Sequence, residues 1–240
     1  NTLLPASNYE FQVQALCSIA SAYSSSFSFT TLPATPDTLI KPNSSWKYLA
    51  NGSNQGTAWR KRTFNDASWT SGNAELGYGD GGEATVVSYG PSSTAKYITT
   101  YFRKSFSVNN PSLYTSLTLG MVRDDGIVVY LNGTEVYRNN MPTGTIGYTT
   151  RATTAIGGAD ESAWITTSLN VSSLLQGTNV LAVEIHQQAA NSSDISFNAR
   201  LYASSQPVVP VVTRGAYLQK LTPNGITIRW RTDVACNSVV

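Results

Sequence analysis

The sequence predicts an all-β protein whose main part is an antiparallel β-sandwich or jelly roll. Only 12% of the 240 residues are charged, about half of the share in an average soluble protein. Ser, Thr, Asn, Gly and Tyr take their place, and these residues suit strands and tight turns better than helices. Apolar and polar side chains alternate with a period of two in several stretches, as in half-buried strands. Gly, Pro and Asn-Gly pairs separate these stretches at the spacing of a sandwich.

The first segment, residues 1–33, contains two alternating stretches, Tyr9 to Ala15 and Ser26 to Thr31. About 30 residues cannot bury a core alone, so we expect only part of a domain here. Three residues resemble the tyrosine corner of a fibronectin type III domain, namely Leu3, Pro5 and Tyr9. The resemblance implies that this segment forms the closing strands of such a domain.

The last segment, residues 207–240, starts with a Pro-rich linker and continues with two strand-like stretches, Thr213–Gln219 and Ile226–Thr232. In the second stretch the apolar residues alternate cleanly with polar ones. The two stretches resemble the opening strands of the fibronectin-like domain that precedes the catalytic domain of purple-acid-phosphatase-type metallophosphoesterases. The resemblance implies that the metal ligands of such an enzyme would lie beyond residue 240.

The chain thus begins in closing strands and ends in opening strands of the same kind of sandwich. One explanation is a chain cut through two neighbouring domains. The other is that the two ends complement each other, within one chain or between chains, since unpaired halves would leave exposed strand edges. A disulfide between Cys17 and Cys236, the only cysteines, would fit complementation, and two free thiols remain an alternative.

The central segment, residues 34–206, is expected to be the complete domain. Ile127–Leu131 is almost wholly apolar, as in a strand covered on both faces. Asn132-Gly133 supplies the positive φ angles of a type I′ turn, and Thr134–Tyr137 is predicted to return as the partner strand.

His186, the only histidine, shares one face of a strand predicted for Val180–Gln187 with Glu184. A catalytic base would need a nucleophile and an orienting carboxylate nearby, and Glu184 lies about 7 Å away along the strand. We therefore expect a surface or hydrogen-bonded structural histidine. A single histidine excludes a multi-histidine metal site, and no Gly-x-Ser-x-Gly pattern marks a nucleophilic serine. The sequence predicts no catalytic residue.

Seven pieces of the central segment share a pattern: Trp46–Tyr48, Trp59, Phe64–Trp69, Leu76–Asp80, Tyr101–Phe106, Asp124–Gly133 and Asn179–His186. Together they resemble the galactose-binding-like jelly rolls attached to bacterial secreted hydrolases, including the sugar-binding domains of glycosidases. The resemblance implies a secreted, extracellular or cell-surface location. Such domains serve as carbohydrate-binding modules and as inert spacers. By the same resemblance, Trp46 and Trp69 are expected in the core.

Sugar binding would need an aromatic face for stacking and planar polar groups for the hydroxyls. Four aromatic residues are candidates by their placement in loops: Tyr78, Tyr89, Tyr97 and Trp164. Asn140 and Gln187 are candidates for amide hydrogen bonds. Packing within the protein is the competing interpretation for each aromatic residue.

Acidic residues in turns are candidates for binding calcium, a hard cation that prefers carboxylate and carbonyl oxygens. These candidates are Asp80, Asp124, Asp125 and Asp160. Asp80 falls in a Gly-rich segment, residues 77–83, that is predicted to be a mobile loop. Asp124 and Asp125 also fit a turn whose side chains accept hydrogen bonds from backbone N–H groups. Glu161 and Asp194 are expected to be solvated.

The net charge of +2 and the absence of a Lys/Arg run give no electrostatic basis for nucleic-acid binding. No apolar stretch approaches the ~20 residues of a membrane helix. Two functions stay open. One is a non-catalytic accessory module of a secreted hydrolase that binds a glycan or polysaccharide, with or without calcium. The other is a structural spacer or assembly module whose parent protein is a metallophosphoesterase, with neighbouring domains as partners.

Overall fold

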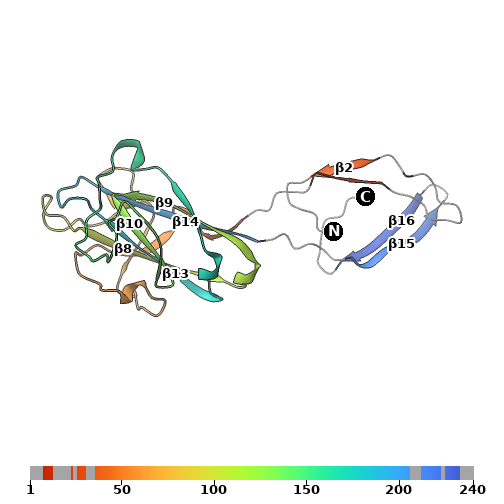
Figure 1. Ribbon diagram of the computed structural model, residues 1–240, viewed down its shortest axis with the longest axis horizontal. Helices are drawn as coiled ribbons and strands as arrows, with labels where there is room; N and C mark the ends of the chain where they lie inside the picture. The colour runs from red at the N-terminus through yellow and green to blue at the C-terminus, as the bar shows by residue number, and fades with distance from the viewer. Residues whose placement is uncertain are drawn as a thin grey trace. The chain divides into compact units, whose positions relative to one another are not determined.

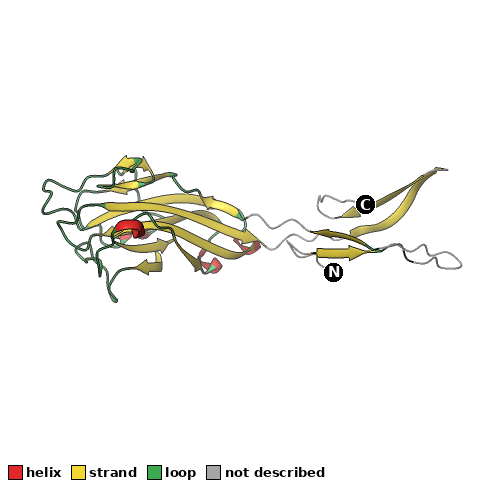
Figure 2. Ribbon diagram, turned by 90° about the horizontal axis from the view of Figure 1, so that it is seen from above, coloured by secondary structure: helices red, strands yellow, loops and turns green. Residues whose placement is uncertain are grey.

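A computed structural model of the chain describes residues 8–12, 23, 26–30, 36–205, 212–222 and 225–232. The chain divides into two compact units: residues 35–205 form the larger, and residues 1–34 with 206–240 form the smaller. In the described residues the units consist of strands, loops and four short 3-10 turns (Figures 1 and 2). The expected all-β fold is confirmed. None of the helical turns described is long and apolar enough to cross a membrane.

Two hairpins make up the described part of the smaller unit. β1 (Asn8–Phe11) pairs antiparallel with β2 (Phe27–Thr30), and β15 (Val212–Thr222) pairs antiparallel with β16 (Gly225–Thr232). Strands were predicted in all four places.

Several predictions about the chain ends fall on residues that the structure does not describe. Cys17 and Cys236 are among them, as are Leu3 and Pro5 of the tyrosine corner. The disulfide and the resemblances to fibronectin and phosphatase domains therefore remain predictions.

The larger unit is a sandwich of two sheets (Figure 2). The first sheet has the strand order β11-β10-β13-β8-β4-β5 and the second β12-β9-β14-β6-β7, with β3 pairing onto β14. The pairing of β6 with β7 is parallel, and the other described pairings are antiparallel. The strands are β3 (Asp37–Ile40), β4 (Ser45–Leu49), β5 (Thr70–Asn73), β6 (Leu76–Tyr78), β7 (Thr85–Val86), β8 (Thr99–Val108), β9 (Tyr114–Asp124), β10 (Gly126–Leu131), β11 (Thr134–Asn139), β12 (Ile165–Leu169), β13 (Gly177–His186) and β14 (Ile195–Ser205). The 3-10 turns are η1 (Ala58–Arg60), η2 (Pro111–Leu113), η3 (Gly158–Asp160) and η4 (Val171–Ser173).

The main core lies between the two sheets, where alternate residues of the long strands meet. Phe197 on β14 stacks on Phe102, with ring centroids 4.3 Å apart, and meets the edge of Trp46 at 4.9 Å. A second cluster lies on the outer face of the first sheet, where Trp59 and Trp69 are buried. The expectation that Trp46 and Trp69 are core residues is confirmed.

The hairpin of β10 and β11 matches the sequence prediction. Ile127–Leu131 is buried throughout because the main core lies on one side and the second cluster on the other. Asn132 has φ 56° and Gly133 has φ 95°, so both turn residues adopt the left-handed conformation that the Asn-Gly pair tolerates.

The segment 77–83 differs from the prediction of a loop. Gly77 and Tyr78 belong to β6, which pairs with β14. A Cβ atom at Gly77 would lie 2.0 Å from the Ile195 carbonyl oxygen, so only glycine permits this close pairing. The loop begins at Gly79, which has φ 108°.

Candidate functional site

The outer face of the second sheet carries an exposed aromatic ring stacked on a guanidinium group. Arg200 projects from β14, and its Cζ atom lies 4.3 Å from the ring centroid of Trp164 and 5.8 Å from that of Tyr202. Trp164 is 37% exposed and directly precedes β12. Within the described residues, Arg200 forms no ion pair with a carboxylate.

Glycine on the intervening strand explains how Arg200 reaches Trp164. Gly120 on β9 is the cross-strand partner of Arg200 on one side and of Thr166 on the other. A Cβ atom at Gly120 would lie 2.7 Å from Arg200 Nε. The absence of a side chain therefore lets the arginine lie flat across β9 toward β12.

Hydroxyl side chains surround this pair. Thr118 is the cross-strand partner of Tyr202 and of Ser168, and directly opposed residues share a face of the sheet. Thr166 and Ser168 are exposed and Thr118 is half-buried. We call this surface the Arg200 face, and its residues are Thr118, Gly120, Trp164, Thr166, Ser168, Arg200 and Tyr202. No acidic side chain belongs to it.

The other predicted sugar-binding aromatics lie together in a different place. Tyr89 is 40% exposed, and its ring meets that of buried Tyr78 at 5.3 Å. Tyr97 donates its backbone N–H to the carbonyl of Tyr89 and lines a shallow pocket of about 190 Å³ with Tyr148. The four predicted aromatics therefore do not form one surface, because only Trp164 lies on the Arg200 face.

The two predicted amide residues are engaged within the protein. Asn140 Nδ2 donates to the carbonyls of Asp125 and Thr154, and its Oδ1 accepts from the Thr154 N–H at 3.1 Å. Gln187 is 1% exposed, and its Nε2 donates to the Tyr78 hydroxyl and to the Asp194 carbonyl. Both amides hold loops in place in this conformation.

Three acidic residues meet where the loops after β6 and η3 approach the start of β14. One carboxylate oxygen each from Asp80, Glu161 and Asp194 lies within 4.8 Å of the others. Asp80 follows β6, Glu161 follows η3 and Asp194 precedes β14. We call these three residues the acidic cluster. Asp194 was expected to be solvated, but it is only 9% exposed because the segment leading into β14 packs against Gly79.

Asp124 lies at the end of β9 beside this cluster. It is fully buried, and neither of its carboxylate oxygens accepts a hydrogen bond from an N–H or hydroxyl donor in the described part of the chain, although its carboxyl group interacts with that of Asp125. Its cross-strand partner is Ser196, whose Oγ lies 2.8 Å from Asp80 Oδ2. Burial, followed by the charge of Asp125, raises the pKa of Asp124 to about 9. Burial and the neighbouring Asp194 carboxylate raise the pKa of Asp80 to about 6.

The remaining two predicted calcium ligands have other positions. Asp125 accepts the N–H of Ile156 at 2.6 Å with Oδ1 and that of Gln188 at 2.8 Å with Oδ2. This arrangement matches the turn interpretation, because the side chain satisfies backbone donors of two loops. Asp160 is exposed at the end of η3, and its neighbour Glu161 joins the acidic cluster instead.

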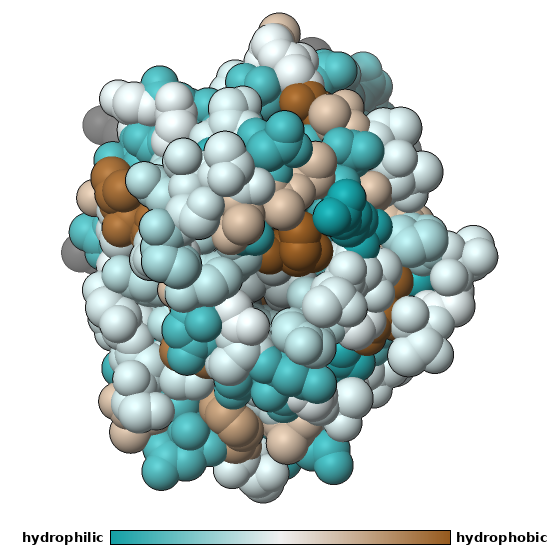
Figure 3. Space-filling model, turned by 90° about the vertical axis from the view of Figure 1, so that its left-hand side faces the viewer, coloured by the Kyte–Doolittle hydropathy of each residue, from teal (hydrophilic) through white to brown (hydrophobic). Residues whose placement is uncertain are grey.

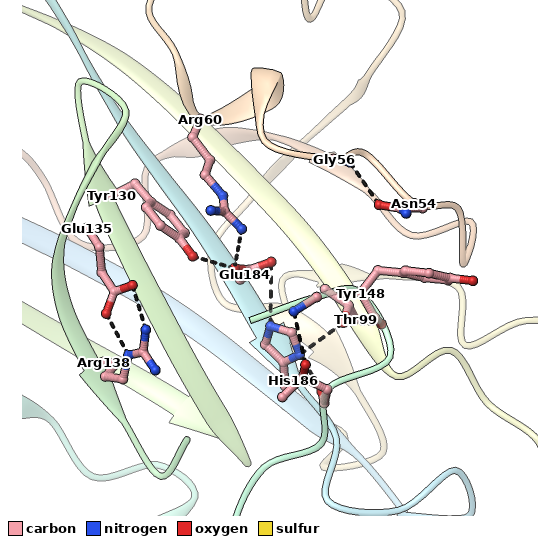
Figure 4. Close-up of polar contacts among 12 residues, drawn as sticks. Asn54, Gly56, Arg60, Thr99, Tyr130, Glu135, Arg138, Tyr148, Glu184 and His186 are labelled. Carbon is pink, nitrogen blue, oxygen red and sulfur yellow. Dashed lines mark hydrogen bonds and ion pairs between the residues drawn. The ribbon is translucent and has the colours of Figure 1, made fainter. Parts of the chain in front are cut away.

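His186 lies in a buried polar network on β13 (Figure 4). Its Nε2 atom is 3.5 Å from Glu184 Oε2, because the two side chains converge on one face of the strand. The other oxygen, Oε1, accepts from the Tyr130 hydroxyl at 2.6 Å and from Arg60 Nη2 at 3.2 Å. The carboxylate is thus shared by three partners.

A hydroxyl also lies against His186, but the proton positions exclude a nucleophile–base pair. His186 Nδ1 is 2.7 Å from the Thr150 carbonyl oxygen, which can only accept, so Nδ1 carries the proton. Thr99 Oγ1, 3.0 Å from Nδ1, donates its own proton to the Tyr148 carbonyl at 2.7 Å. Thr99 is only 3% exposed. The network therefore stabilises the loop at 148–150, as expected for a hydrogen-bonded structural histidine.

Figure 3 shows the loop end of the sandwich. Hydrophilic and neutral residues dominate this view, and apolar residues form only small separate spots. A continuous apolar surface is therefore missing from this view.

Neither a protein-family model nor a curated protein matches the chain. Among solved structures, it is similar to β-glucuronidase 2 of Bacteroides uniformis, with 18% identity, a TM-score of 0.46 and coverage of 70% of this chain and 18% of that one. It is also similar to a β-glycosidase from Bacteroides vulgatus, with 15% identity, a TM-score of 0.43 and coverage of 84% of this chain and 25% of that one. A third similar structure is the β-glucuronidase of an uncultured Clostridium species, with 11% identity, a TM-score of 0.42 and coverage of 97% of this chain and 35% of that one. The chain spans at most about a third of the length of these structures.

Proposed function

We propose that the larger unit is a non-catalytic carbohydrate-binding module that binds its ligand on the Arg200 face. The observation that carries this proposal is the exposed ring of Trp164, held by the guanidinium of Arg200 on an open, hydroxyl-rich sheet. The apolar face of a sugar ring can stack on an exposed aromatic ring, and planar polar groups satisfy its hydroxyls. The contact with Arg200 fixes the ring in advance, which lowers the entropic cost of binding.

A non-catalytic role is supported by the state of the one histidine. His186 is fully buried, and its Nε2 atom, which is the basic nitrogen when Nδ1 carries the proton, faces the Glu184 carboxylate at 3.5 Å, so a substrate cannot reach it. The resemblance of the central segment to domains of secreted hydrolases supports an accessory role outside the cell. In that role the module would hold a neighbouring catalytic domain close to a polysaccharide.

Retention of the full chain on insoluble polysaccharides, combined with a glycan array, tests the proposal. Trp164→Ala and Arg200→Gln should each reduce retention about tenfold, since the stacking of a planar nucleic-acid base on one aromatic ring is worth roughly 1–3 kcal/mol and we expect a sugar ring to fall at the lower end. Tyr89→Ala is the matched control because that ring is exposed to a similar extent but lies elsewhere. The proposal fails if the wild-type chain binds no glycan, or if only Tyr89→Ala reduces binding.

The alternative of a structural spacer also has one observation in its favour. Residues 1–34 and 206–240 form one compact unit, so the larger unit would be an insertion between strands of a second sandwich. A spacer predicts no retention on any polysaccharide. Light scattering separates the two versions of complementation, because pairing within one chain gives a monomer and pairing between chains gives a dimer.

A further inference from the structure

We propose that the acidic cluster of Asp80, Glu161 and Asp194, with Asp124 directly beside it, binds one divalent cation and prefers Ca²⁺ to Mg²⁺. This site differs from the ligand set expected from the sequence, because Glu161 and Asp194 take the places of Asp125 and Asp160. It lies at the loop end of the sandwich and does not depend on glycan binding to the Arg200 face.

The spacing of the three carboxylates fits a common cation. Ca²⁺ binds oxygen at about 2.4 Å, so two of its ligands can be at most about 4.8 Å apart. The three oxygens of the acidic cluster all lie within 4.8 Å of one another. A single ion between them can therefore contact all three with only small side-chain adjustments.

Asp124 provides independent evidence that the cluster lacks a positive partner. A buried carboxylate normally accepts hydrogen bonds, and leaving its oxygens without partners costs free energy. Within the described residues, neither oxygen of Asp124 accepts a hydrogen bond from an N–H or hydroxyl donor, and its carboxyl group instead interacts with that of Asp125. Its side chain lies on the same face of the sheet as Ser196. Because the Ser196 hydroxyl contacts Asp80, this face leads into the cluster. The charges of Asp194 and Glu161 also act on Asp124.

No protein cation neutralises the three carboxylates of the acidic cluster in the described residues. Their oxygens form no ion pair with Lys, Arg or His. Lys96 comes near, but its Nζ donates to the backbone carbonyls of Ser192 and Ser193. Like charges at this separation repel each other strongly in a partly buried site. A bound divalent cation would remove the repulsion.

The preference for Ca²⁺ follows from the ligands and their placement. Asp80 is exposed and Glu161 half-buried, so water can complete a shell of six to eight oxygens on the open side. The three ligands come from separate loops, which suits the flexible geometry of Ca²⁺ better than the strict octahedron of Mg²⁺. The bound ion would also tie these loops together.

Thermal unfolding and titration calorimetry of the full, EDTA-treated chain test the site. Saturating Ca²⁺ should raise the unfolding temperature of the wild type by about 5 °C, and Mg²⁺ by less at equal concentration. Glu161→Gln and Asp194→Asn should lose most of this shift and the binding heat. Asp160→Asn is the matched control, because it removes an adjacent exposed carboxylate and should keep both.

The unfolding temperatures of the variants in EDTA show whether misfolding explains a lost response to Ca²⁺. Asp194→Asn removes a like charge, so without a cation it should unfold at the wild-type temperature or above it. The proposal is overturned if the wild type shows neither heat nor a temperature shift with Ca²⁺, or if Asp160→Asn loses the response as much as Glu161→Gln. An equal response to Mg²⁺ would overturn the stated preference. Glycan retention is measured separately in EDTA, so that failure of the glycan-binding proposal can be distinguished from failure of the cation proposal.

Discussion

Arg200 lies against Trp164 because Gly120, on the strand between them, has no side chain to keep them apart. The arginine starts on β14, crosses β9 and meets the tryptophan that leads into β12. Three strands that are distant in sequence therefore build one surface. The resulting pair is exposed, and in the described residues no carboxylate pairs with the guanidinium.

Gly120→Ala should separate this pair without destabilising the fold. The new Cβ atom would lie 2.7 Å from Arg200 Nε and 3.0 Å from its Cγ, so the flexible side chain must move. We expect polysaccharide retention to fall about as far as in Arg200→Gln. The free energy of unfolding should change by less than about 1 kcal/mol, since alanine also lowers the entropy of the unfolded chain.

A matched control for this substitution is Gly147→Ala, because the nearest atom to a Cβ there is Thr150 Oγ1 at 3.9 Å. This variant should keep full retention. If Gly120→Ala binds polysaccharide as well as Gly147→Ala, the position of Arg200 does not matter for binding.

The hairpin of β10 and β11 could be predicted from the sequence, whereas the Arg200 face could not. The turn at Asn132-Gly133 and the apolar run before it are local patterns, and both predict the observed hairpin. The Arg200 face depends on the register that places residues 120, 166 and 200 in one row across three strands. A single sequence contains no local signal for that register. A cross-strand glycine beside an arginine becomes informative only when the pairing is known.

The acidic cluster was partly missed for a related reason. Asp80 was predicted as a ligand from its Gly-rich surroundings, whereas Glu161 and Asp194 look like ordinary loop acids in the sequence. Their carboxylates meet because the three loops that carry them converge in the fold. The turn pattern at Asp124 and Asp125 was recognised, but it could not reveal that only the side chain of Asp125 accepts backbone N–H groups in the described residues.

Without a cation, the stability of the fold should decrease as the pH rises, and Asp124 should contribute to this decrease. Its pKa is 3.8 in the unfolded chain and about 9 in the folded one. Between these values the unfolded state has lost the proton and the folded state keeps it, so each rise in pH favours unfolding. Asp124→Asn should therefore show a shallower dependence and be more stable than the wild type at pH 8.

Unfolding temperatures measured in EDTA from pH 5 to 8.5 check this prediction. The quantity of interest is the difference between Asp124→Asn and the wild type, because the contributions of other groups largely cancel in it. That difference should grow steadily with pH. Asp160→Asn, which removes an exposed carboxylate, should give a nearly constant difference. A constant difference for Asp124→Asn as well would show that its pKa is not raised in the folded chain.

Arg103 should be far more important for stability than Arg138, although both pair with an acid. Arg103 has a side chain that is 2% exposed, and it contacts Asp66 at 2.8 Å as well as the carbonyls of Trp59 and Lys61. Arg103→Ala would leave these partly buried acceptors without a donor and release the segment that covers the second cluster. We expect a loss of about 3 kcal/mol in urea unfolding.

Arg138→Ala is the comparison. This arginine pairs with Glu135 at 2.6 Å, but its side chain is 26% exposed and that of Glu135 is 34% exposed. Solvent screening reduces the value of such a pair to about 0–1 kcal/mol. Similar losses in the two variants would mean that the contacts of Arg103 do not hold the 58–69 segment in place.

The side chain of Asn132 should stabilise the fold in addition to allowing the positive φ angle of the turn. Its Oδ1 accepts the Val180 N–H at 3.0 Å, and its Nδ2 donates to the Ser173 carbonyl at 2.9 Å and to Asn179 Oδ1 at 2.8 Å. Asn132→Gly keeps the positive φ without strain but loses all three bonds. The expected cost is about 2 kcal/mol in urea unfolding, since partly buried partners are left unsatisfied. Asn43→Gly is the control, because Asn43 also has a positive φ of 58° but is exposed, and within the described residues its side chain bonds only to that of Asn198. If both variants lose the same free energy, the bonds of Asn132 to β13 add nothing to the stability of the sandwich.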